Sequence, residues 1–261
     1  MIHTVLTIAG SDPSGGAGIQ ADLKTFSRLK VYGMAAITAL TAQNTTGVDG
    51  VMPVPPDFVR LQVGAVLRDI AAEAVKTGML VNAEIIETVA AMLRQYDIKR
   101  VVVDPVLIAT SGARLLEPDA IDVLKHRLAP AALIITPNIA EASALTGREI
   151  DTIRDMEEAA RQIKELGSKY VLVKGGHLEG DAEDVLFDGH SFTRFVSPRV
   201  NTRDVHGTGC VLSAAIAAHL ARGETVEDAV ALGKHFVTEA IRRGLRLGNG
   251  HGPCDPVGLE P

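Results

Sequence analysis

Val205-His206-Gly207-Thr208-Gly209-Cys210 runs without a break into Val211-Leu212-Ser213-Ala214-Ala215-Ile216, and the chain is organised around this stretch. The glycines on either side of Thr208 let the backbone turn tightly and approach a ligand closely. A long, alanine-rich helix is predicted to follow, and the first amides of a helix have no intrahelical partner. These donors lie at the positive end of the helix dipole, which favours anions such as phosphate. A glycine-rich helix start beside a small buried cysteine is an equally good interpretation of the stretch alone.

Composition narrows the class of protein. The 261 residues are 46% hydrophobic but only 3% aromatic, without tryptophan, which favours an aliphatic core of parallel strands under helices. A formal net charge of −6, with no run of like charges, argues against a nucleic-acid partner. No apolar stretch approaches the length of a membrane span, so we expect no membrane association. Two cysteines without a C-x-x-C pair fit a cytoplasmic protein.

Strand and helix patterns alternate along the chain. The predicted strands are residues 3–9, 35–41, 51–54, 74–77, 100–103, 133–136 and 170–173, followed by a hairpin of 183–188 and 191–196. The predicted helices are residues 19–29, 56–70, 82–96, 118–128, 156–166, 211–221 and 225–243, with another after Asn138. This alternation predicts an α/β fold with a mostly parallel central sheet and helices on both faces. Without an internal repeat or linker, residues 1–261 are expected to form one domain with no separate lid domain.

The glycine-rich loop at residues 10–18 follows the first predicted strand, and it excludes two familiar nucleotide sites. It has no lysine at its end, so it is not a P-loop. Its glycines do not have the G-x-G-x-x-G spacing of a dinucleotide site, which excludes a dehydrogenase of that type. We expect the loop to bind a small molecule or to serve as a tight turn.

Polar residues follow several predicted strands at their carboxyl ends, where ligands bind in open α/β sheets. Gln43 offers one acceptor and two donors that would match an aminopyrimidine edge, although a lone glutamine more often stabilises its own loop. Met79 could line a flat apolar pocket or pack in the core. Lys174 places a positive charge where it could neutralise phosphate.

Two acidic residues at the same edge could serve a magnesium ion. Asp104 ends a buried strand before Pro105, where it could hold Mg²⁺, orient a nucleophile or cap the turn. Asn138 and Glu141 lie three positions apart at a helix start, so they could hold the water shell of Mg²⁺ or favour the helix dipole. Together with the lysine and the anion site, these residues are the set that phosphoryl transfer needs.

The chain resembles the hydroxymethylpyrimidine/phosphomethylpyrimidine kinases of thiamine biosynthesis, in the ribokinase-like superfamily. The resemblance covers nearly the whole chain, from residue 6 to residue 253. It is carried by Gly15-Gly16-Ala17-Gly18-Ile19-Gln20-Ala21-Asp22, Thr41-Ala42-Gln43-Asn44-Thr45, Lys76-Thr77-Gly78-Met79-Leu80, Asp104-Pro105-Val106, Thr136-Pro137-Asn138-Ile139-Ala140-Glu141 and His206-Gly207-Thr208-Gly209-Cys210. The resemblance implies phosphorylation of 4-amino-5-hydroxymethyl-2-methylpyrimidine and of its monophosphate, with ATP and Mg²⁺ as cofactors.

The resemblance also implies roles for individual residues. Gln43 would bind the pyrimidine, surrounded by Gly10, Ala17, Asp22, Met79 and Val106. Lys174 and Thr208 would bind ATP, Asp104 and Glu141 the metal, and Gly207, Thr208, Gly209 and Cys210 would form the catalytic anion hole. The expected assembly is a homo-oligomer, namely a dimer.

Two departures from related motifs affect the site. Sugar kinases of the superfamily carry an aspartate base where this chain has Cys210, as is usual in the vitamin kinases. A helix N-terminus is expected to lower the pKa of this thiol, which favours the thiolate but weakens it as a base. Asp204-Val205 replaces the Asn-Thr expected before His206, which could alter nucleotide contacts. The alternative functions are a pyridoxal kinase and a non-catalytic vitamin- or nucleotide-binding sensor.

Overall fold

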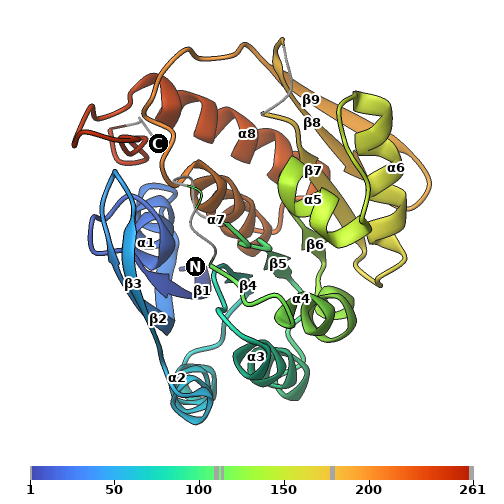
Figure 1. The fold of residues 1–261 in the computed structure, drawn as a ribbon. Helices are drawn as coiled ribbons and strands as arrows, with labels where there is room; N and C mark the ends of the chain where they lie inside the picture. Colours follow the sequence, from blue (N-terminus) through green and yellow to red (C-terminus); the bar gives the residue numbers. More distant parts are fainter. Residues whose placement is uncertain (1, 109–111, 113–114, 177–179, 259–261) are drawn as a thin grey trace.

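The computed structural model describes residues 2–108, 112, 115–176 and 180–258. The strands are β1 (Thr4–Ser11), β2 (Tyr32–Gln43), β3 (Val48–Pro53), β4 (Ala74–Thr77), β5 (Val101–Val103), β6 (Ile134–Ile135), β7 (Tyr170–Lys174), β8 (Ala182–Phe187) and β9 (Phe192–Ser197). Within the described residues they form one nine-stranded sheet in the order β3-β2-β1-β4-β5-β6-β7-β8-β9, as Figure 1 shows. Strands β2, β1, β4, β5, β6 and β7 are parallel, and β3, β8 and β9 add antiparallel pairings at the two edges. The predicted mostly parallel sheet is confirmed.

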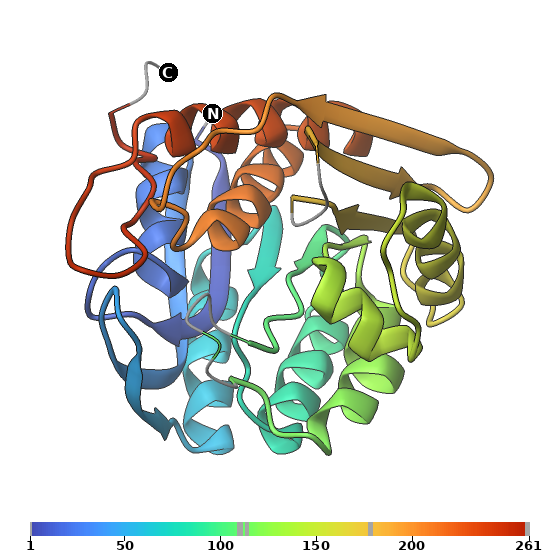
Figure 2. The ribbon, with the colours of Figure 1, turned by 45° about the horizontal axis from the view of Figure 1, so that its top comes forward.

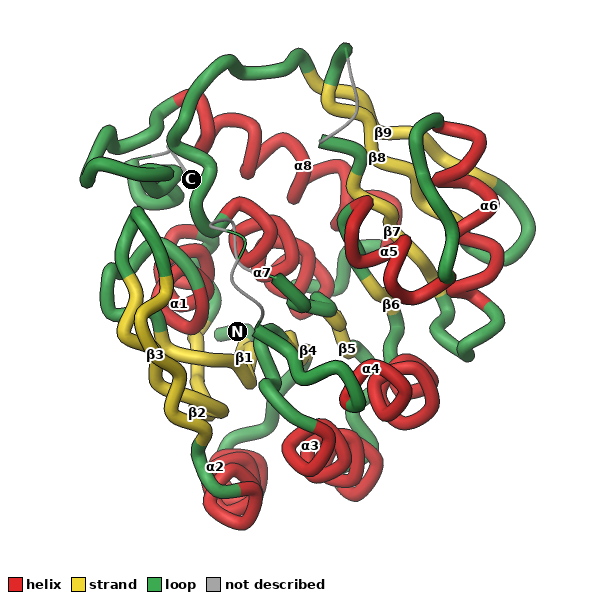
Figure 3. The backbone as a smooth tube through the Cα atoms, in the orientation of Figure 1, coloured by secondary structure: helices red, strands yellow, loops and turns green. Residues whose placement is uncertain are grey.

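Helices cover both faces of the sheet (Figure 3). They are α1 (Gly18–Arg28), α2 (Pro56–Asp69), α3 (Ala83–Gln95), α4 (Ala120–Val123), α5 (Ile139–Thr146), α6 (Ile153–Lys164), α7 (Thr208–Ala221) and α8 (Val226–Arg242). Helix α4 continues into a π-helical turn (Leu124–Leu128) and a 3₁₀ turn (Ala129–Ala131). Helices α1, α7 and α8 pack on one face, whereas α2, α3, α4 and α6 pack on the other.

Alternate strand residues point into two separate cores. Val102 packs with α7 and α8, whereas its neighbours Val101 and Val103 pack with the helices of the opposite face. Adjacent side chains of a strand point to opposite sides of its sheet, so strands buried on both faces are apolar at every position. The short aliphatic runs of the sequence are explained by this double burial.

The strand order reverses at β1, and this reversal places the ligand-binding edge. After β1 the chain builds β2 and β3 on one side and then crosses to β4 on the other. The connections that leave β1 and β4 therefore diverge, and they open a crevice at the carboxyl ends of the strands, where ligands bind in such sheets. Figure 2 shows helix α7 beside this central part of the sheet, with α8 along its outer side.

The observed elements differ from the predicted ones mainly at their ends. Strand β2 extends to Gln43, so this residue is the last of the strand and does not belong to the loop beyond it. Helix α7 begins at Thr208, so Gly209 and Cys210 lie in its first turn and only Gly207 precedes it. The predicted helix at 118–128 is α-helical only over Ala120–Val123, and Pro130, which has no amide donor, follows in the 3₁₀ turn. The predicted hairpin of β8 and β9 is confirmed.

Candidate active site

A cavity of about 720 Å³ lies at the carboxyl edge of the sheet. It is bordered by the loop after β1, the end of β2, the starts of α5 and α7, the end of β7 and one face of α8. All but one of the residues predicted for the site line this cavity: Gly10, Ala17, Gln43, Met79, Asp104, Val106, Glu141, Lys174, Gly207, Thr208, Gly209 and Cys210. The exception is Asp22.

The start of helix α7 is open to the cavity. Gly207, the residue before the helix, has a left-handed conformation with φ of 79°, and an added Cβ atom there would lie 1.8 Å from the carbonyl oxygen of Gly16. Only glycine fits such a position. No side chain caps the helix, and its first turn contains no acidic residue. The amide of Thr208 donates to the carbonyl of Val205 at 3.3 Å, so the amides of Gly209 and Cys210 are the ones left for an anion.

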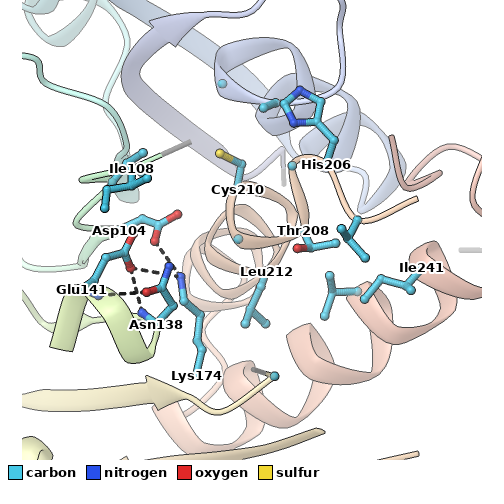
Figure 4. A pocket seen from close by; sticks show the side chains of 18 of the residues that line it. Asp104, Ile108, Asn138, Glu141, Lys174, His206, Thr208, Cys210, Leu212 and Ile241 are labelled. Carbon is cyan, nitrogen blue, oxygen red and sulfur yellow. Dashed lines mark hydrogen bonds and ion pairs between the residues drawn. The ribbon is translucent and has the colours of Figure 1, made fainter. Parts of the chain in front are cut away.

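A lysine and two carboxylates lie on one side of this helix start (Figure 4). The Nζ atom of Lys174 is 2.9 Å from Oδ1 of Asp104 and 3.9 Å from Oε2 of Glu141. Ser213, in the second turn of α7, donates a hydrogen bond of 3.1 Å to the other carboxylate oxygen of Asp104. The cluster thus connects the ends of β5 and β7 with helices α5 and α7.

Asp104 and Lys174 are held in their charged forms. Burial acts to raise the pKa of Asp104, but the ammonium groups of Lys174 and Lys76 outweigh it, so the pKa lies below its usual value. Burial acts to lower the pKa of Lys174, but Asp104 and Glu141 outweigh it and raise the pKa. The pair is an ammonium ion facing a carboxylate at the border of the cavity.

Glu141 both caps the start of helix α5 and faces the cavity. Its amide donates to Oδ1 of Asn138 at 2.9 Å, and its carboxylate accepts from the amide of Asn138 at 2.7 Å, which forms a capping box at the start of α5. The same carboxylate faces Lys174 in the cavity. Burial raises the pKa of Glu141 to about 7, although Lys174 opposes this shift. Glu141 therefore changes charge near neutral pH.

The thiol of Cys210 behaves contrary to the expectation from its helix position. Burial raises the pKa of this thiol to about 11, and the opposing effect of the Lys76 ammonium is smaller. Near neutral pH the thiol is therefore protonated. To act as a base, the thiol would first have to lose its proton, which this raised pKa disfavours at neutral pH.

Gln43, the last residue of β2, lines the cavity. Its Oε1 atom lies 3.2 Å from the hydroxyl of Thr41, and this hydroxyl is also 3.0 Å from the carbonyl oxygen of Ser11. Gly10 and Met79 lie next to each other there, because a Cβ atom added to Gly10 would be 3.1 Å from the sulfur of Met79. An amide beside a flat apolar wall suits a planar, polar-edged ring.

Asp22 lies outside the cavity, in the core. Its carboxylate accepts hydrogen bonds from Lys76 Nζ at 2.8 and 3.0 Å and from Thr7 Oγ1 at 2.6 Å, and neither charged side chain is exposed. Burial alone would lower the pKa of Lys76, but the Asp22 carboxylate raises it above its usual value. In this geometry Asp22 cannot contact a ring bound in the cavity directly, contrary to the role expected for it beside the pyrimidine.

Sequence reasoning missed three buried pairs of ionisable side chains. They are Asp22–Lys76, Asp184–Lys234 and Asp12–His206. Signals for two of them were present: Lys76 interrupts a four-residue buried strand, and Lys234 follows the apolar Val230 at helical spacing in α8. Lys234 and Asp184 are 2.7 Å apart and line the end of the cavity near Leu212 and Ile241.

The donor set at Asp104 and Glu141 fits a magnesium ion held through few protein ligands. Carboxylate oxygens are the ligands that Mg²⁺ prefers, and it usually keeps several waters and binds substrate phosphates as well. Among the described residues, no group of three or more His, Cys, Asp or Glu side chains could hold a metal ion by itself. The two carboxylates would therefore need phosphate oxygens to complete a site.

No helix in the described part of the chain is long and apolar enough to cross a membrane.

The family comparison and two curated relatives agree. Residues 12–255 match the family model described as phosphomethylpyrimidine kinase. The chain is 53% identical over 255 residues to the thiamine biosynthesis bifunctional protein ThiED of Geobacter sulfurreducens. The matching region covers 97% of this chain but only 52%, about half, of that protein. It is 48% identical over 256 residues to the hydroxymethylpyrimidine/phosphomethylpyrimidine kinase of Bacillus subtilis, covering 97% of this chain and 94% of that protein.

Solved structures share the fold over nearly the whole chain. The pyridoxal kinase of Bacillus subtilis, in an ADP complex, has a TM-score of 0.92 and 42% identity, with 98% of this chain and 97% of that chain covered. The phosphomethylpyrimidine kinase of Clostridium difficile 630 has a TM-score of 0.82 and 47% identity, with 92% of this chain and 100% of that chain covered.

The Asp22–Lys76 pair generates a stability prediction. Lys76→Met leaves the Asp22 carboxylate buried and unpaired, so we expect the free energy of unfolding to fall by about 3–5 kcal/mol. The double variant Asp22→Leu/Lys76→Met should recover most of this loss, because replacing both charges removes the unpaired one. Urea unfolding at pH 7 measures both changes.

The matched control is Lys99→Met, which removes an exposed lysine that pairs with Asp97. It should change the free energy of unfolding by less than about 1 kcal/mol. A double variant as unstable as Lys76→Met alone would contradict the account of the buried pair.

Proposed function

The chain belongs to the phosphomethylpyrimidine kinase family, and we infer that it transfers the γ-phosphoryl group of ATP first to hydroxymethylpyrimidine and then to the resulting monophosphate, in thiamine biosynthesis. One observation carries this inference beyond the family match. The open start of α7, the Lys174 cluster and Gln43 border one cavity, so an acceptor ring and a triphosphate can meet there. The reaction needs mainly positioning and charge neutralisation, which these groups supply.

Each part of the cavity has a role in the transfer. Gln43 holds the edge of the pyrimidine, and its ring rests against Met79 and Gly10. The acceptor oxygen forms a bond to the γ-phosphorus while the bond from that phosphorus to the leaving ADP oxygen breaks. The proton of the acceptor hydroxyl passes to a phosphate oxygen or to water, because a loose transition state does not require a strong base.

The start of α7 and Lys174 hold the phosphate charge. The amides of Gly209 and Cys210, in the first turn, donate to the oxygens of the transferred group, and such preorganised donors favour the charge of the transition state. Lys174 exchanges Asp104 for a phosphate oxygen. Asp104 and Glu141 would then hold Mg²⁺, which when bound neutralises phosphate charge.

Pyridoxal is the second candidate substrate. The observation that favours it is the likeness of this fold to a pyridoxal kinase, with a TM-score of 0.92. Gln43 favours the pyrimidine, because its amide offers a donor and an acceptor side by side to an aminopyrimidine edge. Turnover with ATP on the pyrimidine alcohol, its monophosphate and pyridoxal, assayed in parallel, separates the two candidates. Faster turnover of pyridoxal than of both pyrimidines would replace the proposed function.

We also propose that the kinase forms a dimer through the edge made by β2, β3 and α2. Large apolar side chains are exposed there on neighbouring elements: Tyr32, Leu40, Val51, Met52, Phe58 and Leu61. Contiguous apolar surface of this kind usually marks an interaction site, and the same hairpin carries Gln43. A monomeric mass in equilibrium sedimentation would reject the dimer.

The cytoplasm is the proposed compartment. Cys210 and Cys254 are both free thiols, which suits a reducing compartment. Cell fractionation with an antibody to the chain tests this assignment.

Gln43 should determine which ring is accepted. Gln43→Ala leaves the polar edge of the bound pyrimidine unpaired, at a cost of about 1–3 kcal/mol, so we expect kcat/KM for the pyrimidine alcohol to fall roughly ten- to a hundredfold. The KM for ATP should stay unchanged. Gln95→Ala, which changes an exposed glutamine at the end of α3, is the control and should behave as the parent. Unchanged pyrimidine affinity in Gln43→Ala would remove this residue from the substrate site.

Glu141 should make the magnesium requirement depend on pH. A carboxyl group binds a cation only when deprotonated, and the pKa of Glu141 is raised to about 7. As the pH falls below 7, its protonated fraction grows, so the Mg²⁺ concentration for half-maximal rate should rise about tenfold per pH unit. Glu141→Gln keeps the acceptor for the Asn138 amide but should need more Mg²⁺ at pH 8.

ATP itself titrates in this pH range. The test therefore compares how strongly the Mg²⁺ requirement depends on pH in the parent and in the variant. In Glu141→Gln the extra pH dependence should disappear. The control variant is Glu84→Gln, in the exposed first turn of α3. A parent and a Glu141→Gln variant with the same pH dependence would take Glu141 out of the metal site.

The first turn of α7 should matter more than the Cys210 thiol. At Gly209 an added Cβ atom would lie 3.5 Å from Lys174 Nζ and 3.7 Å from Asp104 Oδ2, so alanine fits, but the methyl groups of valine would occupy the place of the phosphate. We expect Gly209→Val to slow single-turnover transfer by about 10²–10³-fold, as the loss of an anion-hole donor does, and Gly209→Ala to slow it much less.

Cys210→Ala should slow the same transfer by less than about tenfold, because the thiol is protonated at neutral pH. In the parent enzyme the rate should also stay level between pH 8 and 10. A rate that climbs throughout this range and is abolished in Cys210→Ala would make the thiolate the base.

A further inference from the structure

His206 connects three segments that are far apart in the sequence. It is buried and directly precedes Gly207, at the start of α7. Its ring Nε2 atom is 2.8 Å from Oδ2 of Asp12, in the loop after β1. Its amide donates to the carbonyl of Gly252 at 3.0 Å, and its carbonyl accepts from the amide of Cys254 at 3.4 Å.

Asp12 in turn organises the loop that borders the pyrimidine end. The carboxylate oxygen that faces His206 also accepts from the amide of Ala17 at 2.8 Å. The other oxygen accepts from the amide and the hydroxyl of Ser14 at 2.9 and 2.8 Å. The conformation of residues 12–17 is therefore set around one buried carboxylate, and His206 is the side chain outside the loop that holds it.

The histidine ring also contacts this loop directly. A Cβ atom added to Gly16 would be 2.4 Å from Cδ2 of His206, closer than real Cβ contacts come. The ring and residue 16 of the loop are therefore in close contact. Figure 4 shows His206 and Cys210 on the side of the α7 start away from Lys174.

The C-terminal tail completes the connection. The amide of His251 donates to the carbonyl of Thr45 at 2.9 Å, and the amide of Gly250 donates to the Thr45 hydroxyl at 3.3 Å. Thr45 lies two residues beyond Gln43, in the turn between β2 and β3. The tail thus spans from the strand that carries Gln43 to the backbone of His206.

We propose that His206 is a positioning residue, which fixes the pyrimidine end of the cavity relative to the phosphate-binding start of α7. The inference rests on the proposed function, because it assumes that the acceptor and the phosphoryl group meet between these two parts. His206 does not touch the reacting atoms in this account. It acts through Asp12, through Gly16 and through the tail, and it sets the distance that the acceptor oxygen must cross.

The expected consequence is a loss of turnover rather than of ATP binding. A displacement of about 1 Å between reacting groups costs roughly 10²-fold in rate, so His206→Ala should lower kcat by about that factor. The KM for ATP should change by less than about threefold, because the variant keeps the contacts that bind ATP equally in the ground state and in the transition state. His206→Gln places an amide donor within reach of Asp12, so it should recover at least about tenfold of the lost kcat.

His219, which lies in helix α7, provides a matched control. It is also buried, at 7% exposure against 5% for His206, but its Nδ1 atom has no hydrogen-bond partner among the described residues. His219→Ala should change thermal stability without changing kcat. Asp12→Asn combined with His206→Ala should be no slower than His206→Ala alone, because residues that act as one unit are not additive.

The experiment measures kcat, the two KM values and Tm for the parent, His206→Ala, His206→Gln, Asp12→Asn, the double variant and His219→Ala. The acceptor is whichever of the pyrimidine alcohol, its monophosphate and pyridoxal the parent enzyme turns over fastest. A wrong substrate assignment would then appear in the parent itself, whereas a wrong positioning role would appear only in the variants.

An unchanged kcat in folded His206→Ala would overturn the inference, as would an equal loss in His219→Ala or no recovery in His206→Gln. If His206→Ala does not fold, Asp12→Asn decides: a lower kcat at the parent Tm supports the positioning role, and the parent kcat overturns it.

Discussion

Helix α7 begins beside the cavity with no side chain to cap it, and the site depends on this constraint. In the described part of the chain the amides of Gly209 and Cys210 have no hydrogen-bond partner, so the first turn is open to a ligand. The packing of α7 supports it, because every residue from Val211 to Ala221 is buried between the sheet and helices α1 and α8. Gly207 also packs closely against the carbonyl of Gly16, and this contact helps to fix the position of the open amides. In the proposed function, donors held in this way would need little rearrangement at the moment of transfer.

Buried charges around the cavity complete this arrangement. Lys174, Lys76 and Lys234 each pair with an aspartate at 2.7–2.9 Å. Buried pairs contribute little net stability, because desolvation offsets their attraction. They do hold the lysine side chains in place. The Asp104–Lys174 pair differs from the Asp22–Lys76 pair in facing the cavity, with Lys174 13% exposed and Lys76 fully buried. Lys174 can therefore exchange its partner for a ligand, whereas Lys76 provides a fixed charge below the site.

The sequence predicted the residues whose placement follows from strand ends alone. Gln43, Asp104 and Lys174 end or follow parallel strands, and the carboxyl ends of such strands meet at one edge, so their convergence could be derived without a structure. Asp22 could not be placed this way, because its pairing depends on the register that sets Thr7 beside Lys76 on neighbouring strands. The Asp184–Lys234 and Asp12–His206 pairs join residues 50 and 194 positions apart, and no local pattern encodes such contacts. The pKa of Cys210 also required the structure, since burial outweighs the helix dipole there.

The account claims that acceptor and phosphate meet at the start of α7, and a crystal structure with a non-hydrolysable ATP analogue, Mg²⁺ and the pyrimidine alcohol tests this most directly. The predicted result has the ring on Gln43 and the γ-phosphate on the amides of Gly209 and Cys210. Lys174 should then have left Asp104 for a phosphate oxygen. A pyrimidine bound at the Lys234 end of the cavity, or a γ-phosphate held away from α7, would contradict the account.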